Sequence, residues 1–385
     1  NNKWFSDLDN NVGFKGNDSL FVYSILPIYY NSIQQSQNSN DFSISDNTVD
    51  AIKNYQIKFG SEVIPSEINL KLEYFYNELK IFNKLSYIYA LTGLFMLFLL
   101  VIQILNYKKW RAILIKLCFW IISLAFLTHT LGLATRWIIS GHAPWSNAYE
   151  SVIYIAWSTI LSGYIFSKKN ELSMAATSIL SSLLLMVAGL NWLDPTITNL
   201  VPVLDSYWLL IHVAIITASY GFLALGAILG FLNLILMIIQ NKNNIFRISS
   251  TLKELTYINE MSITIGLFML SIGTFLGGVW ANESWGRYWG WDPKETWAFA
   301  SILIYVFVLH MRFIPKLKGV FAFNIASIIA YGSIIMTYFG VNFYLSGLHS
   351  YAAGDPMPIP SFIPWSIVVL FITSIIAYVN NKRLI

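Results

Sequence analysis

This sequence has few charged residues and a single cysteine. Only 11% of its 385 residues are charged, against about 25% in soluble proteins, while 56% are hydrophobic and the mean hydropathy is +0.57. This composition excludes a water-soluble enzyme. The one cysteine, Cys118, lies in an apolar run, which excludes a disulfide framework and a thiolate metal cluster. The chain also lacks a phosphate loop and a nucleotide fingerprint. We expect no nucleic acid as a partner.

The start of the sequence lacks both a methionine and a signal peptide. We therefore expect a fragment, a processed product or the second half of a longer polypeptide. Residues 1 to 83 are rich in Asn, Ser and Gln and carry six lysines against ten acidic residues. From Pro65 onward, apolar residues recur on one helical face. We expect residues 1 to 83 to form a polar, acidic, extracytoplasmic region that ends in a helix leading into the membrane.

Long apolar segments fill the rest of the chain, residues 84 to 385. Each is long enough to cross a bilayer, which needs about 20 residues. The sequence therefore predicts an all-α, polytopic helical membrane bundle of eight or nine transmembrane helices. Small-residue pairs within the segments indicate close helix packing. The expected segments are 84–106, 112–135, 148–166, 172–190, 207–239, 257–280, 296–313, 320–344 and 362–380.

Basic residues gather in alternate loops, which predicts the orientation by the positive-inside rule. The loops that we place in the cytoplasm, with the C-terminus, hold Lys108, Lys109, Arg111, Lys168, Lys169, Lys242, Arg247, Lys253, Arg312, Lys316, Lys318, Lys382 and Arg383. The other bundle loops carry only Arg136, Arg287 and Lys294. Residues 1 to 83 and the tryptophan-rich loop at 280–297 then lie on the outer face.

Five histidines divide by depth in this bundle. His212 and His349 belong to outer helix ends, whereas His310 follows Trp297 by 13 residues, about 20 Å along a helix toward the cytoplasm. His310 therefore cannot share a metal ion with the outer pair. If His310 is half of a bis-histidine site, its partner is on another chain, because no second histidine in this sequence reaches its level. For the two remaining histidines, His129 and His142, we favour a structural role.

The stretch SWGRYWGWDPKETW combines tryptophans with glycines at an outer helix boundary. Two outer imidazoles suit a heme iron, and flat indole rings suit a porphyrin. The alternative is an ordinary aromatic belt at the membrane surface. Asp292-Pro293-Lys294-Glu295 also has the pattern of a helix N-terminus with Asp292 as its cap, which does not exclude contact with a ligand. The tryptophans expected to form a heme platform are Trp285, Trp289, Trp291 and Trp297.

The segment WGRYWGWDPKETWAF resembles the WWD signature of heme-handling membrane proteins, most closely the CcsA-type (ResC-type) half of the system II cytochrome c synthase, CcsBA. Further segments, in the family's order, resemble its outer-histidine, membrane-histidine and loop stretches. They are YWLLIHVAIITASYG, WAFASILIYVFVLHMR, GVNFYLSGLHSYAAG and LGLATRWIISGHAPWSNAYES. Together they cover most of residues 112 to 355, whereas the first 80 residues show no such motif.

The resemblance implies a holocytochrome c synthase of the heme lyase type in the bacterial cytoplasmic (inner) membrane. It would export heme b and attach it to the Cys-x-x-Cys-His motifs of apocytochrome c. His212 and His349 would be axial ligands of an outer heme beside the WWD loop, including Asp292. His310 would bind heme at an inner site whose other histidine belongs to a CcsB/ResB half, separate or fused upstream.

The chain offers no nucleophile of its own, so we expect it to act by positioning heme and protecting it from oxidation. Heme propionates require cations, and the candidates in the outer loops are Arg136, Arg287 and Lys294.

Three other functions are weighed against the synthase. A heme exporter or chaperone that delivers heme without ligating it would need the same tryptophan loop. A cytochrome b of electron transfer commonly carries two histidines on one helix, and no segment here does so. A transporter of another flat ligand leaves the outer histidine pair without a purpose. The closer match of GLHSY and SGHAPWSNAYES to the CcsA type favours the synthase.

Overall fold

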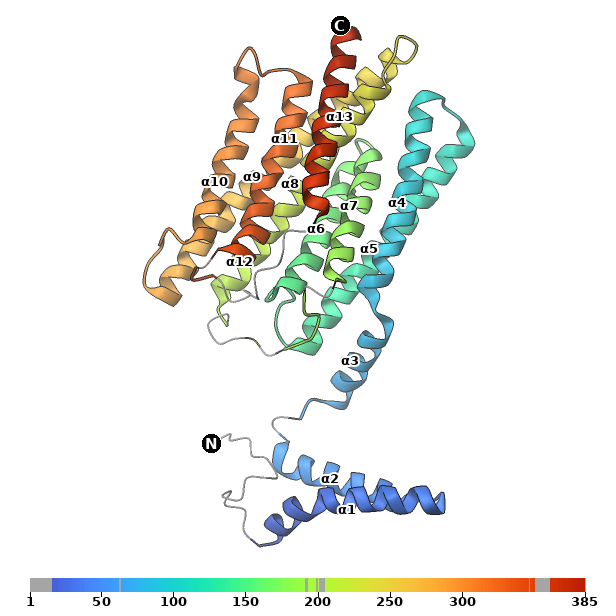
Figure 1. The fold of residues 1–385 in the computed structure, drawn as a ribbon, viewed down its shortest axis with the longest axis vertical. Helices are drawn as coiled ribbons and strands as arrows, with labels where there is room; N and C mark the ends of the chain where they lie inside the picture. Colours follow the sequence, from blue (N-terminus) through green and yellow to red (C-terminus); the bar gives the residue numbers. More distant parts are fainter. Residues whose placement is uncertain are drawn as a thin grey trace. The chain divides into compact units, whose positions relative to one another are not determined.

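The computed structural model describes residues 16 to 61, 64 to 190, 193 to 198, 200, 205 to 345, 347 to 349 and 361 to 384. The chain divides into two compact units, Asn1–Lys71 and Leu72–Ile385. Every regular element among the described residues is a helix, and seven helices are long and apolar enough to cross a membrane (Figure 1). The predicted all-α polytopic membrane bundle is confirmed.

The first unit contains a pair of helices, α1 (Asn17–Ser39) and α2 (Ser43–Gly60). The chain reverses between them at Asn40, which adopts a left-handed conformation with φ of 56°. Phe21 of α1 stacks on Tyr55 of α2 with ring centroids 4.4 Å apart. Few side chains of this unit are buried, and those of Leu20 and Tyr30 are about 70% exposed. Aromatic stacking between the two helices is therefore a main contact of the first unit.

The second unit is the helical bundle. It is entered through α3, and α4 follows directly after Lys80, whose φ of 44° breaks the helix between them. Helix α3 (Glu67–Leu79) begins before the unit boundary at Leu72. The other helices of this unit are α4 (Ile81–Leu105), α5 (Lys109–Ser140), α6 (Ala148–Ser167), α7 (Leu172–Ala188), α8 (Tyr207–Ile239), α9 (Ile245–Trp285), α10 (Pro293–His310), α11 (Val320–Ile335), α12 (Val341–Tyr344) and α13 (Phe362–Leu384). A π-helical turn, Met336–Gly340, joins α11 to α12.

All nine predicted apolar segments are helical, but two of them are not among the seven long spans. Helix α7 has 17 residues, which is the lower limit for crossing a bilayer. Helix α6 has 20 residues and carries buried polar side chains, including Glu150 and Ser158. Both helices lie in the interior of the bundle, where such side chains contact protein.

Helix α8 is the central element of the bundle. It packs against α6, α9, α11 and α13. In its most apolar 18-residue stretch 67% of the residues are buried, against 28% in the corresponding stretch of α9. Glycines allow this close packing, as predicted from their spacing. A Cβ at Gly226 would lie 2.8 Å from Asn259 of α9, and one at Gly230 would lie 2.6 Å from Ser327 of α11. Larger residues at these positions would push the helices apart.

The helix boundaries differ from the predictions mainly near the polar ends. Helix α9 begins at Ile245 rather than at residue 257, because its first three turns carry polar side chains yet bury Ile248, Leu252 and Leu255. Helix α5 continues to Ser140, five residues beyond the expected end. Helix α9 also extends to Trp285, so the segment between α9 and α10 that contains the tryptophan-rich loop is only 286–292.

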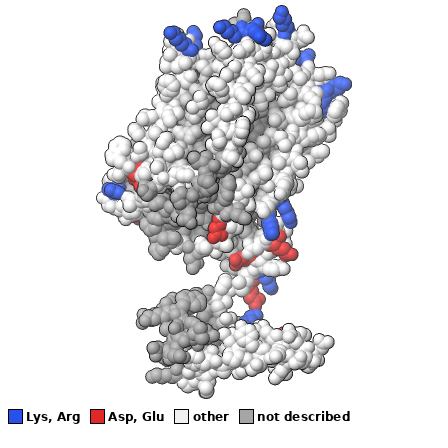
Figure 2. Space-filling view, in the orientation of Figure 1, with Lys and Arg blue, Asp and Glu red and all other residues white. Residues whose placement is uncertain are grey.

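The basic residues of the bundle gather at the end where α13 finishes, as Figure 2 shows. The same end holds the α4–α5, α6–α7, α8–α9 and α10–α11 connections (Figure 1). The charge asymmetry read from the loops is therefore a property of the folded bundle.

Candidate functional site

A cavity of about 600 Å³ lies at the opposite end of the bundle. His212 of α8 and His349 of the segment after α12 both line it. The remaining wall comes from the end of α9, the segment 286–292 and the first turn of α10, with Trp280, Trp289 and Lys294 among its residues. The structure therefore brings together both histidines that were predicted to form an outer ligand pair. The volume lies within the range of small-molecule and cofactor sites.

His212 is held by the backbone of α9. Its Nδ1 lies 2.6 Å from the carbonyl oxygen of Gly273, which makes Nδ1 the protonated donor. The ring fits because Gly277 has no side chain: a Cβ there would lie 2.5 Å from the ring carbon Cε1. Since Nδ1 donates, Nε2 carries the lone pair that is available to a metal.

His349 is held by Asp292 in the same manner. Its Nδ1 lies 2.8 Å from Oδ2 of Asp292, and the backbone N–H of Leu348 donates to Oδ1 at 2.6 Å. Asp292 is only 7% exposed. A carboxylate that accepts from the Nδ1 of a histidine is a common outer partner of metal-ligating histidines. His212 and His349 therefore have the same tautomer, with Nε2 left unprotonated.

Asp292 is also the N-cap of α10, as predicted. The backbone N–H of Lys294 donates to its carboxylate at 3.2 Å, and Glu295 accepts from the N–H of Asp292 at 3.3 Å, which completes a capping box. One carboxylate thus begins α10 and fixes the segment containing His349. Sequence reasoning identified the cap and treated contact with a ligand as a separate question. The structure shows that the cap positions a candidate ligand.

The ionisation of this pair follows from its surroundings. Burial raises the pKa of Asp292, but the hydrogen bonds from His349 and Leu348 outweigh it and leave the pKa below its ordinary value. Burial and the charge of Lys294 lower the pKa of His349, although Asp292 opposes this shift. Both effects favour a neutral imidazole beside a charged carboxylate, which is the form that binds a metal.

The tryptophans occupy different places. Trp285 packs edge-on against His349 with ring centroids 5.0 Å apart, and Trp289 lines the cavity. Trp291 is 69% exposed, with φ of 58° at a sharp turn, while Trp297 lies on α10 outside the cavity lining. The prediction missed Trp280, which is 1% exposed. Its ring centroid lies 4.7 Å from that of Trp285 and 5.7 Å from that of His349. Its signal was its position on α9, five residues before Trp285.

Among the three candidate cations, Lys294 alone lines this cavity. Its Nζ donates to Oδ1 of Asn342 at 3.0 Å, and it is the one Lys or Arg among the described lining residues. Arg287 is exposed, and its guanidinium lies over Gly290. The structure therefore separates a cation within the cavity from one on the adjoining loop.

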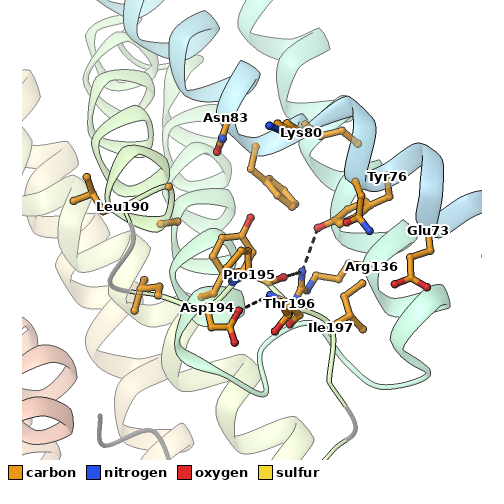
Figure 3. A pocket seen from close by; sticks show the side chains of 17 residues that line it. Glu73, Tyr76, Lys80, Asn83, Arg136, Leu190, Asp194, Pro195, Thr196 and Ile197 are labelled. Atoms are coloured by element: carbon orange, nitrogen blue, oxygen red, sulfur yellow. Dashed lines mark hydrogen bonds between the residues drawn. The ribbon is translucent and has the colours of Figure 1, made fainter. Parts of the chain in front are cut away.

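Arg136 belongs to a second cavity, of about 980 Å³ (Figure 3). Its guanidinium is fully buried, and all three nitrogens are engaged. Nε donates to Glu150 at 2.8 Å, and the other two nitrogens donate to the carbonyl oxygens of Pro195 and Thr196 at 2.9 and 3.1 Å. Arg136 thus ties the α7–α8 connection to α5 and α6.

The other histidines lie apart from the outer pair or have different partners. His310 is exposed at the end of α10, where Nδ1 donates to the carbonyl oxygen of Val306 at 2.7 Å. His129 is fully buried and contacts the carbonyl oxygen of Ile153 at 3.1 Å. His142 lines the same cavity as the outer pair, and its Nε2 lies 3.1 Å from the carbonyl oxygen of Thr198.

Comparison with known proteins gives the family. Residues 145–349 match the model of the cytochrome c assembly protein family. The chain belongs to the cytochrome c assembly protein family. The matched range spans His212, the WWD loop, His310 and His349, so the family region contains most of the lining of the His212/His349 cavity and the exposed histidine of α10.

Relatives within this family include proteins named for cytochrome c biogenesis. The chain is 45% identical over 325 residues to protein NrfI of Wolinella succinogenes, a match that covers 84% of this chain but 36% of NrfI. It is 36% identical over 250 residues to the cytochrome c biogenesis protein CcsA of Prochlorococcus marinus, covering 58% of this chain and 80% of that protein. CcsA of Guillardia theta is 35% identical over 256 residues, covering 59% and 83%. The chain therefore spans most of a CcsA protein and about a third of NrfI.

Proposed function

We propose that this member of the cytochrome c assembly family holds heme in the outer cavity and joins it to apocytochrome c. The observation that carries the proposal is the matched arrangement of His212 and His349. Each donates Nδ1–H to a fixed protein acceptor and keeps Nε2 for an axial bond to iron. Two helices and a capping carboxylate thus hold two imidazoles at one cavity, as a bis-histidine heme site requires.

The remaining lining residues suit a porphyrin. Trp280 and Trp289 line the cavity with flat apolar surface, which a macrocycle needs, and Trp285 supports this wall by packing against Trp280 and His349. Lys294 supplies the positive charge for a propionate, and this favours it over Arg287 and Arg136. In this proposal Asp292 orients His349 and does not contact heme, while Trp291 and Trp297 lie outside the platform.

The reaction is the addition of two thiols of a Cys-x-x-Cys-His segment across the two vinyl groups of heme. Each addition forms one carbon–sulfur bond, and the thiol proton goes to the other vinyl carbon, so no oxidant or reductant is consumed. The chain contributes no nucleophile to this chemistry. Its role is to hold the substrate heme in one orientation and to exclude competing reactions, from which most of the rate gain derives.

His310 marks the inner heme site in this proposal. It is exposed on α10, and no other histidine among the described residues lines that part of the chain, so the second ligand belongs to a CcsB/ResB-type half. The basic end of the bundle (Figure 2) then faces the cytoplasm of a bacterial cell, and the His212/His349 cavity faces outward. Heme b passes from the inner site to the outer one.

Absorption spectra of the complex, purified with its partner half as isolated and after reduction, test the proposal. We expect His349→Ala to lose the outer heme or leave it oxidised, and added imidazole to restore it. His310→Ala should lower the amount of heme bound at the inner site. If neither substitution changes the heme content or the spectra, the tryptophan segment is an aromatic belt at the membrane surface and the proposal is wrong.

A second assay separates the synthase from a heme exporter. The heme-loaded complex is mixed with a reduced peptide containing Cys-x-x-Cys-His, and thioether formation is followed by the blue shift of the reduced pyridine hemochrome. A synthase forms a covalent heme-peptide. An exporter releases heme that remains extractable into acidified solvent.

A further inference from the structure

Helix α10 has two faces of different character. One is closely packed: Ser301 and Tyr305 are fully buried, and Val308 is 2% exposed. Oγ of Ser301 lies 3.2 Å from Oγ1 of Thr337 in the π-helical turn. Side chains therefore fill the space between α10 and its neighbours at this face. A macrocycle could not move along it without separating the helices.

The opposite face carries an apolar stripe that ends in a histidine. Phe299, Leu303, Phe307 and His310 follow one another at intervals of four, four and three residues, which places them on one side of a helix. The first three side chains are 43%, 53% and 53% exposed. We call these four residues the α10 stripe. Helix α10 lies at one edge of the bundle, beside α9 and α11 (Figure 1). The exposure of these side chains shows that the stripe faces out of the bundle.

One end of the stripe contacts the wall of the His212/His349 cavity, and the other end is the candidate heme ligand His310. The ring of Phe299 lies 6.3 Å from that of Trp289, which lines the outer cavity. At the other end, His310 donates Nδ1–H to Val306, so its Nε2 carries the lone pair, as in His212 and His349. His310 follows Phe299 by eleven positions, which is about 16 Å along the helix.

We propose that the α10 stripe is the track along which heme passes from His310 to the outer cavity, on the surface of this bundle rather than through its core. The inference rests on the proposed function and adds the route. Phenylalanine and leucine side chains suit the flat apolar face of a porphyrin, and the contact between Phe299 and Trp289 joins the track to the cavity wall.

Lipid contact alone accounts for exposed Phe and Leu side chains but not for the arrangement of the stripe. An imidazole on an exposed face of a membrane helix costs free energy and indicates a function. Here it shares one helical face with aromatic side chains, the last of which contacts the wall of a bis-histidine cavity. A track for heme explains why the histidine, the apolar run and the cavity wall are in register.

The test places a polar amide midway along the track. Leu303→Gln is compared with Ile304→Gln, a matched change at a side chain that is 37% exposed but lies about a quarter of a turn away. Each variant is made with and without His349→Ala, and heme per complex is measured by pyridine hemochrome after brief induction. Phe307→Gln is a second variant within the stripe, in case Leu303→Gln is poorly inserted.

We expect Leu303→Gln to lower outer-site heme about tenfold, the factor in rate that ~1.4 kcal/mol for an unpaired amide produces. Adding His349→Ala should then remove at most the remaining tenth, whereas Ile304→Gln should behave as the unmodified complex in both backgrounds. Heme at His310 and co-purification of the partner half should persist. Hemin added to the purified Leu303→Gln complex should fill the outer site, because its cavity is intact.

Three results overturn the track. In the first, His349→Ala lowers heme but Leu303→Gln and Phe307→Gln do not, which leaves the stripe as lipid-facing surface. In the second, Leu303→Gln loses the inner heme or the partner half, which makes the stripe a docking face only. In the third, added hemin does not fill the outer site. If His349→Ala itself changes nothing, the proposed function fails first, and the track fails with it.

Discussion

The carboxylate of Asp292 allows a sharp test of how the outer site is built. In Asp292, Oδ2 accepts from the backbone N–H of Lys294 and from Nδ1–H of His349, whereas Oδ1 accepts from the backbone N–H of Leu348. In Asp292→Asn, an amide oxygen at the Oδ2 position keeps the first two bonds, and Asn is as good an N-cap as Asp. The substitution then removes the negative charge opposite His349 and the acceptor of the Leu348 N–H. The helix start should therefore persist, while the histidine loses its charged partner.

The magnitude follows from the hydrogen bond between His349 and Asp292. A hydrogen bond to a charged group contributes about 1.5–3 kcal/mol and a neutral one about 0.5–1.5 kcal/mol, so the loss is roughly 1–1.5 kcal/mol. Each 1.4 kcal/mol is a factor of ten, and outer partners of metal ligands typically change affinity by about 10- to 100-fold. We expect heme affinity at the outer site to fall roughly tenfold. The heme potential should become more positive, because the imidazole is less basic.

Heme titration and redox titration of the purified complex measure both quantities. Asp194→Asn is the control, since Asp194 also accepts a backbone N–H, from Thr196, but lines the second cavity. Added imidazole should restore His349→Ala but not Asp292→Asn, in which the histidine side chain still occupies its place. An Asp292→Asn complex with unchanged affinity and potential would refute the view that this carboxylate positions a heme ligand.

Two further predictions concern the cavity wall. Gly277→Ala should displace His212 and abolish outer-site heme, because its Cβ would lie 2.5 Å from the imidazole ring. Gly332→Ala is the control: its Cβ would meet no atom within 4 Å, so it should leave heme content unchanged and stabilise its helix slightly. Hemochrome content and thermal unfolding of both variants test this. Lys294→Met should weaken heme binding several-fold, and Arg287→Met should not, because only the lysine lines the cavity. Equal effects of these two changes on the heme dissociation constant would contradict the assignment of Lys294 to a propionate.

Local patterns were enough to predict the helices and some of the site. Hydrophobic periodicity depends on which side chains face lipid or protein, so all nine apolar segments were found, although their polar ends were misplaced at α9. The cap at Asp292 was also predictable, because a capping box lies within four residues. These features depend on neighbours in the sequence.

Contacts between distant segments could not be read in the same way. The bond from His349 to Asp292 joins residues 57 positions apart, and Arg136 and Lys294 differ only in which cavity their helix turns toward. Nothing in the local sequence of Trp280 separates it from a belt tryptophan. Packing of α8, α9 and α10 determines these placements, and one sequence contains no direct signal of that packing.

The partners of Asp292 have a consequence for biogenesis. Its carboxylate is completed by N–H groups of Leu348 and His349, which are made only after α11 has been synthesised. A nascent chain can therefore insert α8, α9 and α10, with His212 and His310 in place, before the His212/His349 cavity is complete. If the cavity holds heme as proposed, capture of heme there has to await the translation of this region, so partly made chains would not compete for a scarce and reactive cargo.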